Sequence, residues 1–144
     1  MNFETIQAAK EFAFAGHAIL TLESRKSGTH HTYKVCRCEA KPGEKDPGNL
    51  YFVSHLTEGS ADEGHWSYLG IVRDGKFSLT KKSSAGAEAP SVKAFAFFNA
   101  SRELHPMLVV HHENHCGRCG RTLTTPESCE AGIGPDCLQK LGRA

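Results

Sequence analysis

Long apolar runs, an excess of charge of one sign and a secretion signal are all missing from this sequence of 144 residues. Because no apolar run is long enough to cross a bilayer, we expect no membrane-spanning segment. The first residues, Met1-Asn2-Phe3-Glu4, have neither the basic nor the apolar region of a secretory signal, so the sequence predicts a cytoplasmic protein. The 39% content of hydrophobic residues exceeds that of a disordered chain and predicts a modest core.

Two classes of function are disfavoured by what is missing. The formal net charge is only +1, whereas a domain that binds DNA through a broad basic face carries a large positive excess. The sequence contains no glycine-rich phosphate loop, no Gly-x-Ser-x-Gly elbow and no paired-carboxylate pattern. We therefore expect a protein that is not an enzyme, with no catalytic residues and no small-molecule substrate.

The residues that are present predict an α+β domain built on a small antiparallel sheet. Apolar spacing predicts a helix over residues 2–15, capped by Asn2, and a second helix that begins at Pro90. Asp74-Gly75 lies between two strand-like segments and predicts a tight hairpin, because both central residues of such a turn need positive φ. About five strands are expected, in an open meander or a barrel-like sheet; the strand-like segments are 18–22, 30–38, 50–56, 66–72 and 76–79, with a further one at 107–110. Residues 1–110 would form this domain and residues 111–144 a separate zinc-binding module.

The six cysteines are the clearest chemical signal. In a reducing cytoplasm they favour metal binding over disulfides. Cys116 and Cys119 form a knuckle in which two thiolates three residues apart grip one ion. Cys137 follows Gly134-Pro135 and would lie in the first turn of a terminal helix, where the helix dipole stabilises a thiolate. This order of elements predicts a treble-clef-like or zinc-ribbon-like module.

The fourth zinc ligand is left open by the spacing. Cys129 would complete a four-cysteine site, and His112 would complete a site of three cysteines and one histidine. His111 and His115 are weaker substitutes, since adjacent histidines point in different directions. With so many ligands in one short segment the coordination sphere closes easily, so we expect a structural Zn²⁺ rather than a catalytic one. Cys36 and Cys38 could bind a second ion with His30 or His55, but ordinary strand residues are the simpler interpretation.

The C-terminal segment resembles a known family. Cys116-Gly-Arg-Cys119-Gly-Arg, Leu123-Thr, Pro126-Glu-Ser and Gly132-Ile-Gly-Pro-Asp-Cys137 are similar to a domain of unknown function common in bacteriophage and prophage genomes. The resemblance implies a zinc-binding tail and an origin in a mobile element, and hence a place in the host cytoplasm. In that family a His-Glu pair often precedes the knuckle, as His112-Glu113 does here, and the position of Cys129 is usually aliphatic. The resemblance therefore favours His112 as the fourth ligand, with Cys129 as the alternative.

Charge and aromatic side chains suggest a surface for nucleic acid. Basic residues cluster in two strand-like regions and beside the knuckle, and the ones that we expect to contact nucleic acid are Arg25, Lys26, Lys34, Arg37, Lys81, Lys82, Arg118 and Arg121. The rings of Tyr51, Phe52, Trp66, Tyr68 and Phe77 would form either a stacking platform for single strands or part of the core. Solvated strand edges are the simpler interpretation of the basic residues, and core packing that of the rings.

Two functions follow as hypotheses. The first is a non-enzymatic phage or prophage accessory protein that binds zinc in its tail and binds nucleic acid. The second is an inhibitor of a host defence protein, such as an anti-CRISPR or another anti-defence factor. This alternative depends on residues 39–63, which carry six acids and could mimic nucleic acid toward a basic protein.

Overall fold

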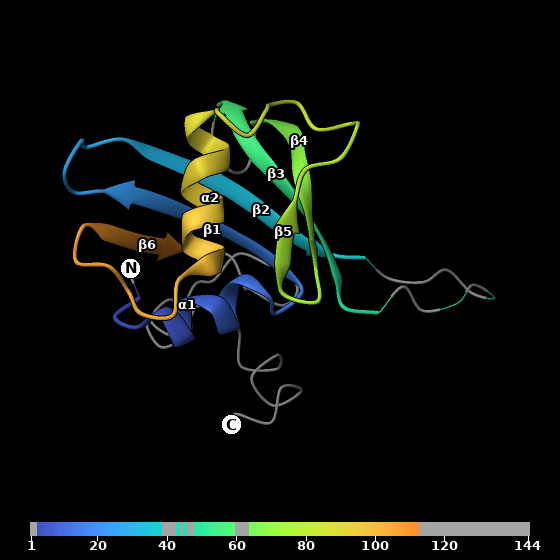
Figure 1. The fold of residues 1–144 in the computed structure, drawn as a ribbon, viewed down its shortest axis with the longest axis horizontal. Coiled ribbons are helices and arrows are strands. Elements are labelled where there is room, and N and C mark those ends of the chain that lie inside the picture. The colour runs from blue at the N-terminus through green and yellow to red at the C-terminus, as the bar shows by residue number, and fades with distance from the viewer. Residues whose placement is uncertain (1–2, 39–42, 44, 46–47, 60–63, 113–144) are drawn as a thin grey trace.

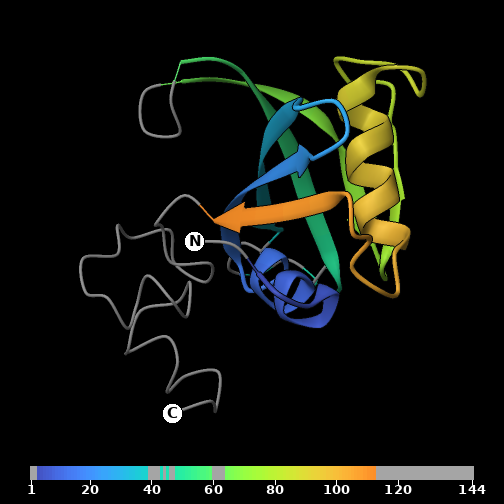
Figure 2. The same ribbon diagram turned by 90° about the vertical axis from the view of Figure 1, so that its left-hand side faces the viewer.

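The computed structural model describes residues 3–38, 43, 45, 48–59 and 64–112. Their fold is α+β, as the sequence predicts, and the antiparallel sheet has six strands in the order β5-β4-β3-β2-β1-β6. The sheet curls into a half-barrel, which Figure 2 shows from its side. The two helices are α1 (Ile6–Ala13) and α2 (Pro90–Ala100). The strands are β1 (His17–Ser24), β2 (His30–Arg37), β3 (Leu50–Glu58), β4 (His65–Arg73), β5 (Lys76–Ser78) and β6 (Leu108–His112).

Helix α2 covers the concave face of the sheet, which we call the inner face (Figure 1). Val92, Phe95 and Phe98 lie buried on the side of the helix that the sequence predicts for them. The ring of Phe95 packs at 5.1 Å from that of Tyr33 in β2 and at 4.9 Å from that of Phe77 in β5. The buried hydroxyl of Tyr33 donates a 2.6 Å hydrogen bond to the Ser91 carbonyl, which ties the sheet to the first turn of α2.

Helix α1 is shorter than the helix expected over residues 2–15. The side chain of Thr5 accepts a hydrogen bond from the Ala8 N–H and caps the helix, so the helix begins at Ile6. The segment before it is extended, and its Phe3 N–H donates to the Val110 carbonyl of β6. The prediction that Asn2 caps the helix was therefore wrong. Lys10 donates to the carbonyls of Asn99 and Ser101, so α1 also holds the C-terminal end of α2.

The hairpin predicted at Asp74-Gly75 is confirmed, with φ of 49° and 82° at the two residues. The β3–β4 pairing contains an irregularity that the sequence does not predict. Val53 pairs with Gly70 and Ser54 pairs with Tyr68, so Leu69 is an extra residue in β4. This bulge reverses the direction of the side chains on its two sides. As a result Leu69 and Val72 are both buried on the inner face, whereas Trp66 and Tyr68 lie on the outer, convex face.

Candidate functional site

The five aromatic residues considered as a stacking platform are divided between the two faces of the sheet. Tyr51 and Phe77 belong to the core on the inner face. Phe52, Trp66 and Tyr68 lie on the outer face, because Phe52 pairs with Cys36 and Ile71 whereas its neighbours Tyr51 and Val53 are buried. The structure thus assigns core packing to two of the rings and leaves three together on one surface. We call Phe52, Trp66 and Tyr68 the aromatic strip.

The aromatic strip is held by defined contacts. The rings of Phe52 and Tyr68 meet edge to face, with 6.3 Å between their centroids. The ammonium nitrogen of Lys34 in β2 lies 4.5 Å from the centroid of the Trp66 ring, a cation–π contact. Phe52 is 41% exposed, which is unusual for a ring of its size. The strip therefore presents aromatic surface to solvent in a fixed arrangement, with a positive charge beside it.

The loop after β5 brings two further cations to this edge of the sheet. The hydroxyl groups of Thr80 and Tyr68 lie 3.1 Å apart, and the Ser84 N–H donates to the Tyr68 carbonyl at 2.9 Å. Because both bonds are made to Tyr68, the intervening Lys81 and Lys82 are held close to the aromatic strip. Both lysines are exposed. Two residues of the predicted nucleic-acid set therefore lie beside the strip.

The outer face of β2 to β5 carries positive charge and no carboxylate as far as Leu56 in β3, beyond which the pairing is irregular and the exposed Glu58 pairs with His65. By strand register, its residues are His30, Thr32, Lys34, Cys36, Leu50, Phe52, Ser54, Leu56, Trp66, Tyr68, Ile71, Arg73, Lys76 and Ser78. None of them is Asp or Glu, and Lys34, Arg73 and Lys76 are cationic. This face attracts anions although the chain as a whole is nearly neutral. Arg73 and Lys76 are additions to the set of contact residues predicted from the sequence.

The remaining predicted contact residues are more widely spread. Arg25 and Lys26 lie exposed in the turn between β1 and β2, and Arg37 is exposed at the other end of β2. Arg118 and Arg121 lie outside the described residues. Two basic regions of the sequence thus contribute to the outer face, but not every residue of the predicted set is gathered there.

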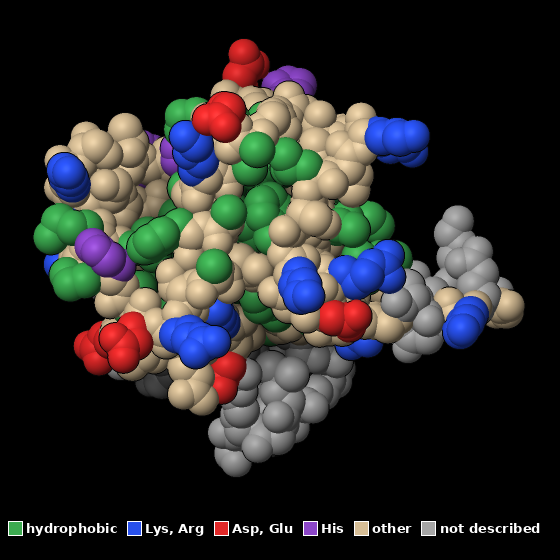
Figure 3. Space-filling view, in the orientation of Figure 1, with side chains coloured by type: hydrophobic (Ala, Val, Ile, Leu, Met, Phe, Trp, Pro, Cys, Tyr) green, Lys and Arg blue, Asp and Glu red, His purple; other side chains and the backbone are tan. Residues whose placement is uncertain are grey.

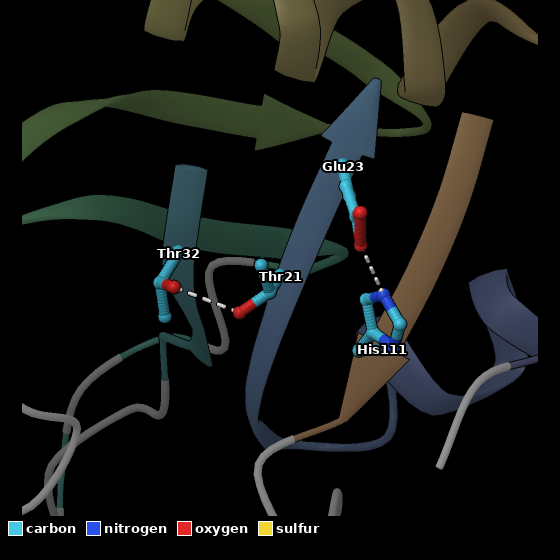
Figure 4. Close-up of polar contacts among 4 residues, drawn as sticks. All are labelled: Thr21, Glu23, Thr32 and His111. Atoms are coloured by element: carbon cyan, nitrogen blue, oxygen red, sulfur yellow. Dashed lines mark hydrogen bonds and ion pairs between the residues drawn. The ribbon is translucent and has the colours of Figure 1, made fainter. Parts of the chain in front are cut away.

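The outer face continues across β1 and β6 as a row of polar side chains (Figure 4). The hydroxyl groups of Thr21 and Thr32 lie 2.7 Å apart. The Nε2 atom of His111 lies 2.9 Å from Oε1 of Glu23, and because a carboxylate oxygen accepts, the imidazole donates. The Glu23 carboxylate of β1 is therefore hydrogen-bonded to a side chain of the neighbouring strand β6.

The predicted metal ligands are mostly beyond the described part of the chain. Cys116, Cys119, Cys129 and Cys137 all lie outside the described residues. His112 is described, and its ring is buried on the inner face at 5.8 Å from the rings of both Phe3 and Phe12. His111 points to the outer face, as expected for adjacent residues of a strand. The choice between His112 and Cys129 stays a prediction.

Cys36 and Cys38 are half-buried free thiols. Burial raises the pKa of the Cys36 thiol, although Lys34 opposes the shift. His55, one of the partners considered for a metal site with this pair, lies on the inner face, whereas Cys36 lies on the outer face. Among the described residues no cluster of three or more metal-binding side chains is found.

Two features of the inner side are not predicted by the sequence. The rings of His31 and His55 lie 5.3 Å apart above Tyr33. Burial is the main cause that lowers the pKa of each, with a smaller contribution from His30 at His31 and from His31 at His55. Beside His31 is a cavity of about 510 Å³ between α2, the β1–β2 hairpin and the start of β6. Residues far apart in sequence form it, so no local motif reveals it.

Comparison with known proteins finds a match to one family model over a quarter of the chain. No curated protein matches this chain, and no solved structure does. Among the described residues no helix is long and apolar enough to cross a membrane. Residues 107–142, which include β6 and the cysteine-rich segment, match the model of a family described as "Family of unknown function (DUF6011)".

Proposed function

We propose that this chain is a non-enzymatic nucleic-acid-binding module that holds single strands on the outer face of its sheet. The observation that supports this most directly is the aromatic strip within the cationic part of the outer face, over β2 to β5. Single-stranded nucleic acid is bound in general by aromatic side chains that stack on bases, together with cations that contact the phosphates. Phe52, Trp66 and Tyr68 supply the rings, and Lys34, Arg73 and Lys76 supply the charge.

Single strands suit this surface better than a duplex. In a duplex the faces of the bases are stacked on one another and are not available to protein rings. Within the described residues, the long helix α2 is packed on the other side of the sheet and does not protrude from this face toward a major groove (Figure 1). Stacking is therefore the contact that this surface offers.

Trp66 makes a direct experiment possible, since it is the single tryptophan of the chain. We expect its fluorescence to be quenched in a saturable way when an unlabelled twelve-nucleotide DNA or RNA strand is added at low salt. A duplex of the same length should bind more weakly. Binding weaker than about 10⁻⁴ M, the level of ordinary non-specific association, would refute the proposal, as would equal affinity for the duplex.

We further propose that the C-terminal segment binds one structural Zn²⁺ through Cys116, Cys119 and Cys137, with His112 as the fourth ligand, in a phage or prophage accessory protein. Protein purified without chelator should contain zinc at about one equivalent. Cys129→Ala discriminates between the two ligand sets better than a change at His112, because His112 also packs against Phe3 and Phe12. Full zinc content in Cys129→Ala supports the histidine set, whereas loss of zinc supports the four-cysteine set.

The alternative function, an inhibitor directed at a defence protein, has less support from the described residues. That hypothesis was based on the acidic segment 39–63. Within it, residues 39–42, 44, 46–47 and 60–63 lie outside the described part of the chain. The fluorescence titration separates the two functions, because an inhibitor that mimics nucleic acid would leave Trp66 unaffected by added strands.

A further inference from the structure

The described part of the chain has three large apolar side chains that are notably exposed, and two of them lie together away from the aromatic strip. Phe97 in α2 is 51% exposed and Met107, just before β6, is 43% exposed. Both line the cavity of about 510 Å³, together with Leu22 and Ala94. Figure 3 views this side of the molecule and shows hydrophobic side chains gathered around α2, with cationic and histidine side chains among them. Exposed apolar surface next to a cavity is typical of a binding site.

Hydrogen bonds of the Met107 backbone hold this part of the cavity wall in place. The Met107 N–H donates to Nδ1 of His105 at 3.0 Å, and the Met107 carbonyl accepts from the Arg25 N–H at 2.8 Å. The ring of Phe97 packs at 5.8 Å from that of His105. Because these contacts fix the backbone of Met107, its side chain starts from a fixed point at the edge of the cavity. A pre-formed wall lowers the entropic cost of binding.

The charge around the cavity is predominantly positive. Lys26 in the β1–β2 turn and Lys93 in α2 both line it. Lys93 forms an ion pair with Glu88 at 3.3 Å, but both side chains are strongly exposed, and such a pair contributes little. Glu23 also lines the cavity, and its carboxylate is engaged by His111. The arrangement is an apolar interior with two ammonium groups at its rim.

We propose that this cavity is a binding site for a small amphiphilic anion, with an apolar body against Leu22, Ala94, Phe97 and Met107 and a carboxylate-like head between Lys26 and Lys93. Its volume is within the range of about 300–1,000 Å³ that is usual for small-molecule sites. The site is separate from the aromatic strip, since α2 and the strip lie on opposite faces of the sheet. A ligand here would therefore be bound independently of nucleic acid.

The test uses the two methionines of the chain, Met1 and Met107. Protein labelled with ¹³C in the methionine methyl groups is titrated with decanoate and, in parallel, with the uncharged decanol. We expect decanoate to shift the Met107 methyl signal with a Kd below about 1 mM, and to leave that of Met1 unchanged. Decanol should bind at least several-fold more weakly, because it lacks the charge that the lysines recognise.

Three variants make the outcome decisive. Ala94→Leu fills the cavity and should abolish the shift, whereas Lys93→Gln should weaken decanoate several-fold and leave decanol unchanged. The control Lys76→Gln, on the outer face, should weaken the binding of nucleic acid and leave the binding of decanoate unchanged. The proposal is overturned if Met107 does not respond up to about 1 mM, if decanol binds as tightly as decanoate, or if Ala94→Leu, folded by circular dichroism, binds like the original chain.

Discussion

The ammonium group of Lys34 lies 4.5 Å from the ring centroid of Trp66, although the two residues belong to strands that do not pair with each other. The lysine of β2 reaches over β3 to the tryptophan of β4. The ammonium lies over the face of the ring, so a base that stacks on that face would displace it, and the displaced cation would stay close enough to contact the nucleotide's phosphate. This relationship joins the two chemical elements of the proposed surface, aromatic faces and positive charge, at a single point.

Replacing Lys34 by Gln should therefore change the salt dependence of binding more than the stacking itself. For single strands, the slope of log K against log salt becomes shallower by about 0.7 for each phosphate that the protein no longer neutralises. We expect this reduction in Lys34→Gln, together with continued quenching of Trp66 fluorescence. Lys93→Gln on the other side of the molecule is the control and should keep the original slope. An unchanged slope in Lys34→Gln would remove this lysine from the interface.

Phe52 and Phe97 form a matched pair of exposed rings on different faces of the molecule. Loss of one stacked base costs about 1–3 kcal/mol. Phe52→Ala should therefore weaken single-strand binding by roughly 5-fold to 150-fold, as measured by titration of Trp66 fluorescence. Phe97→Ala should leave this affinity unchanged, since it removes a similar exposed ring elsewhere. Equal losses in both variants would show that the strip is not the binding surface.

The buried hydroxyl of Tyr33 predicts a stability effect without a binding effect. Tyr33→Phe would leave the buried Ser91 carbonyl without the 2.6 Å hydrogen bond that it accepts in the folded chain. We expect the free energy of unfolding to fall by about 1–2 kcal/mol in urea denaturation. Tyr68→Phe is the matched control, because its hydroxyl bonds to Thr80 at the exposed surface and should contribute less. A larger loss in Tyr68→Phe would contradict this account.

Gly70 is required by the close approach of β5. A Cβ atom at this position would lie 2.5 Å from the backbone carbonyl oxygen of Ser78, and backbone cannot move aside as a flexible side chain can. Gly70→Ala should therefore lower the free energy of unfolding by about 1–3 kcal/mol. Gly86→Ala is the control, because a Cβ there meets nothing within 4 Å. Chemical denaturation of both variants, compared with the original chain, checks the prediction.

The His31–His55 pair predicts the direction of the pH dependence of stability. Burial lowers the pKa of both imidazoles in the folded chain, so the unfolded chain binds more protons as the pH falls through about 6.5. The free energy of unfolding should therefore decrease from pH 7.5 to pH 5. Replacing His55 by Gln should flatten this decrease, which urea denaturation at a series of pH values would measure. A steeper decrease in the variant would contradict the assignment.

Much of the fold was predictable because its signals are local. Asp74-Gly75 predicts the hairpin because these two residue types adopt the positive φ that the turn needs, and the structure has positive φ at both. Val92, Phe95 and Phe98 predict the buried side of α2 from helical spacing, and Pro90 predicts its start. The start of α1 was missed because Thr5 and Asn2 are both good caps, and the extended pairing of Phe3 with Val110 of β6 excludes the earlier start.

The candidate site was predictable only in part. The sequence names all three rings of the aromatic strip, but it cannot separate them from Tyr51 and Phe77. Strict alternation along residues 66–72 would place Trp66, Tyr68 and Val72 on one face. The bulge at Leu69 divides them, because one extra residue inverts the direction of every side chain beyond it.

What the sequence determined by itself is the class of fold, the Asp74-Gly75 hairpin and a C-terminal segment rich in cysteine, since these depend on residues close together in the chain. The tertiary structure decided which rings are exposed, how a nearly neutral chain gathers cations on one part of its outer face, and where an apolar cavity lies. Each of these depends on strand register and on contacts between distant residues, such as Leu22, Phe97 and Met107 around the cavity. A nearly neutral total charge therefore coexists with a locally cationic surface, because strand register gathers Lys34, Arg73 and Lys76 on one part of the outer face.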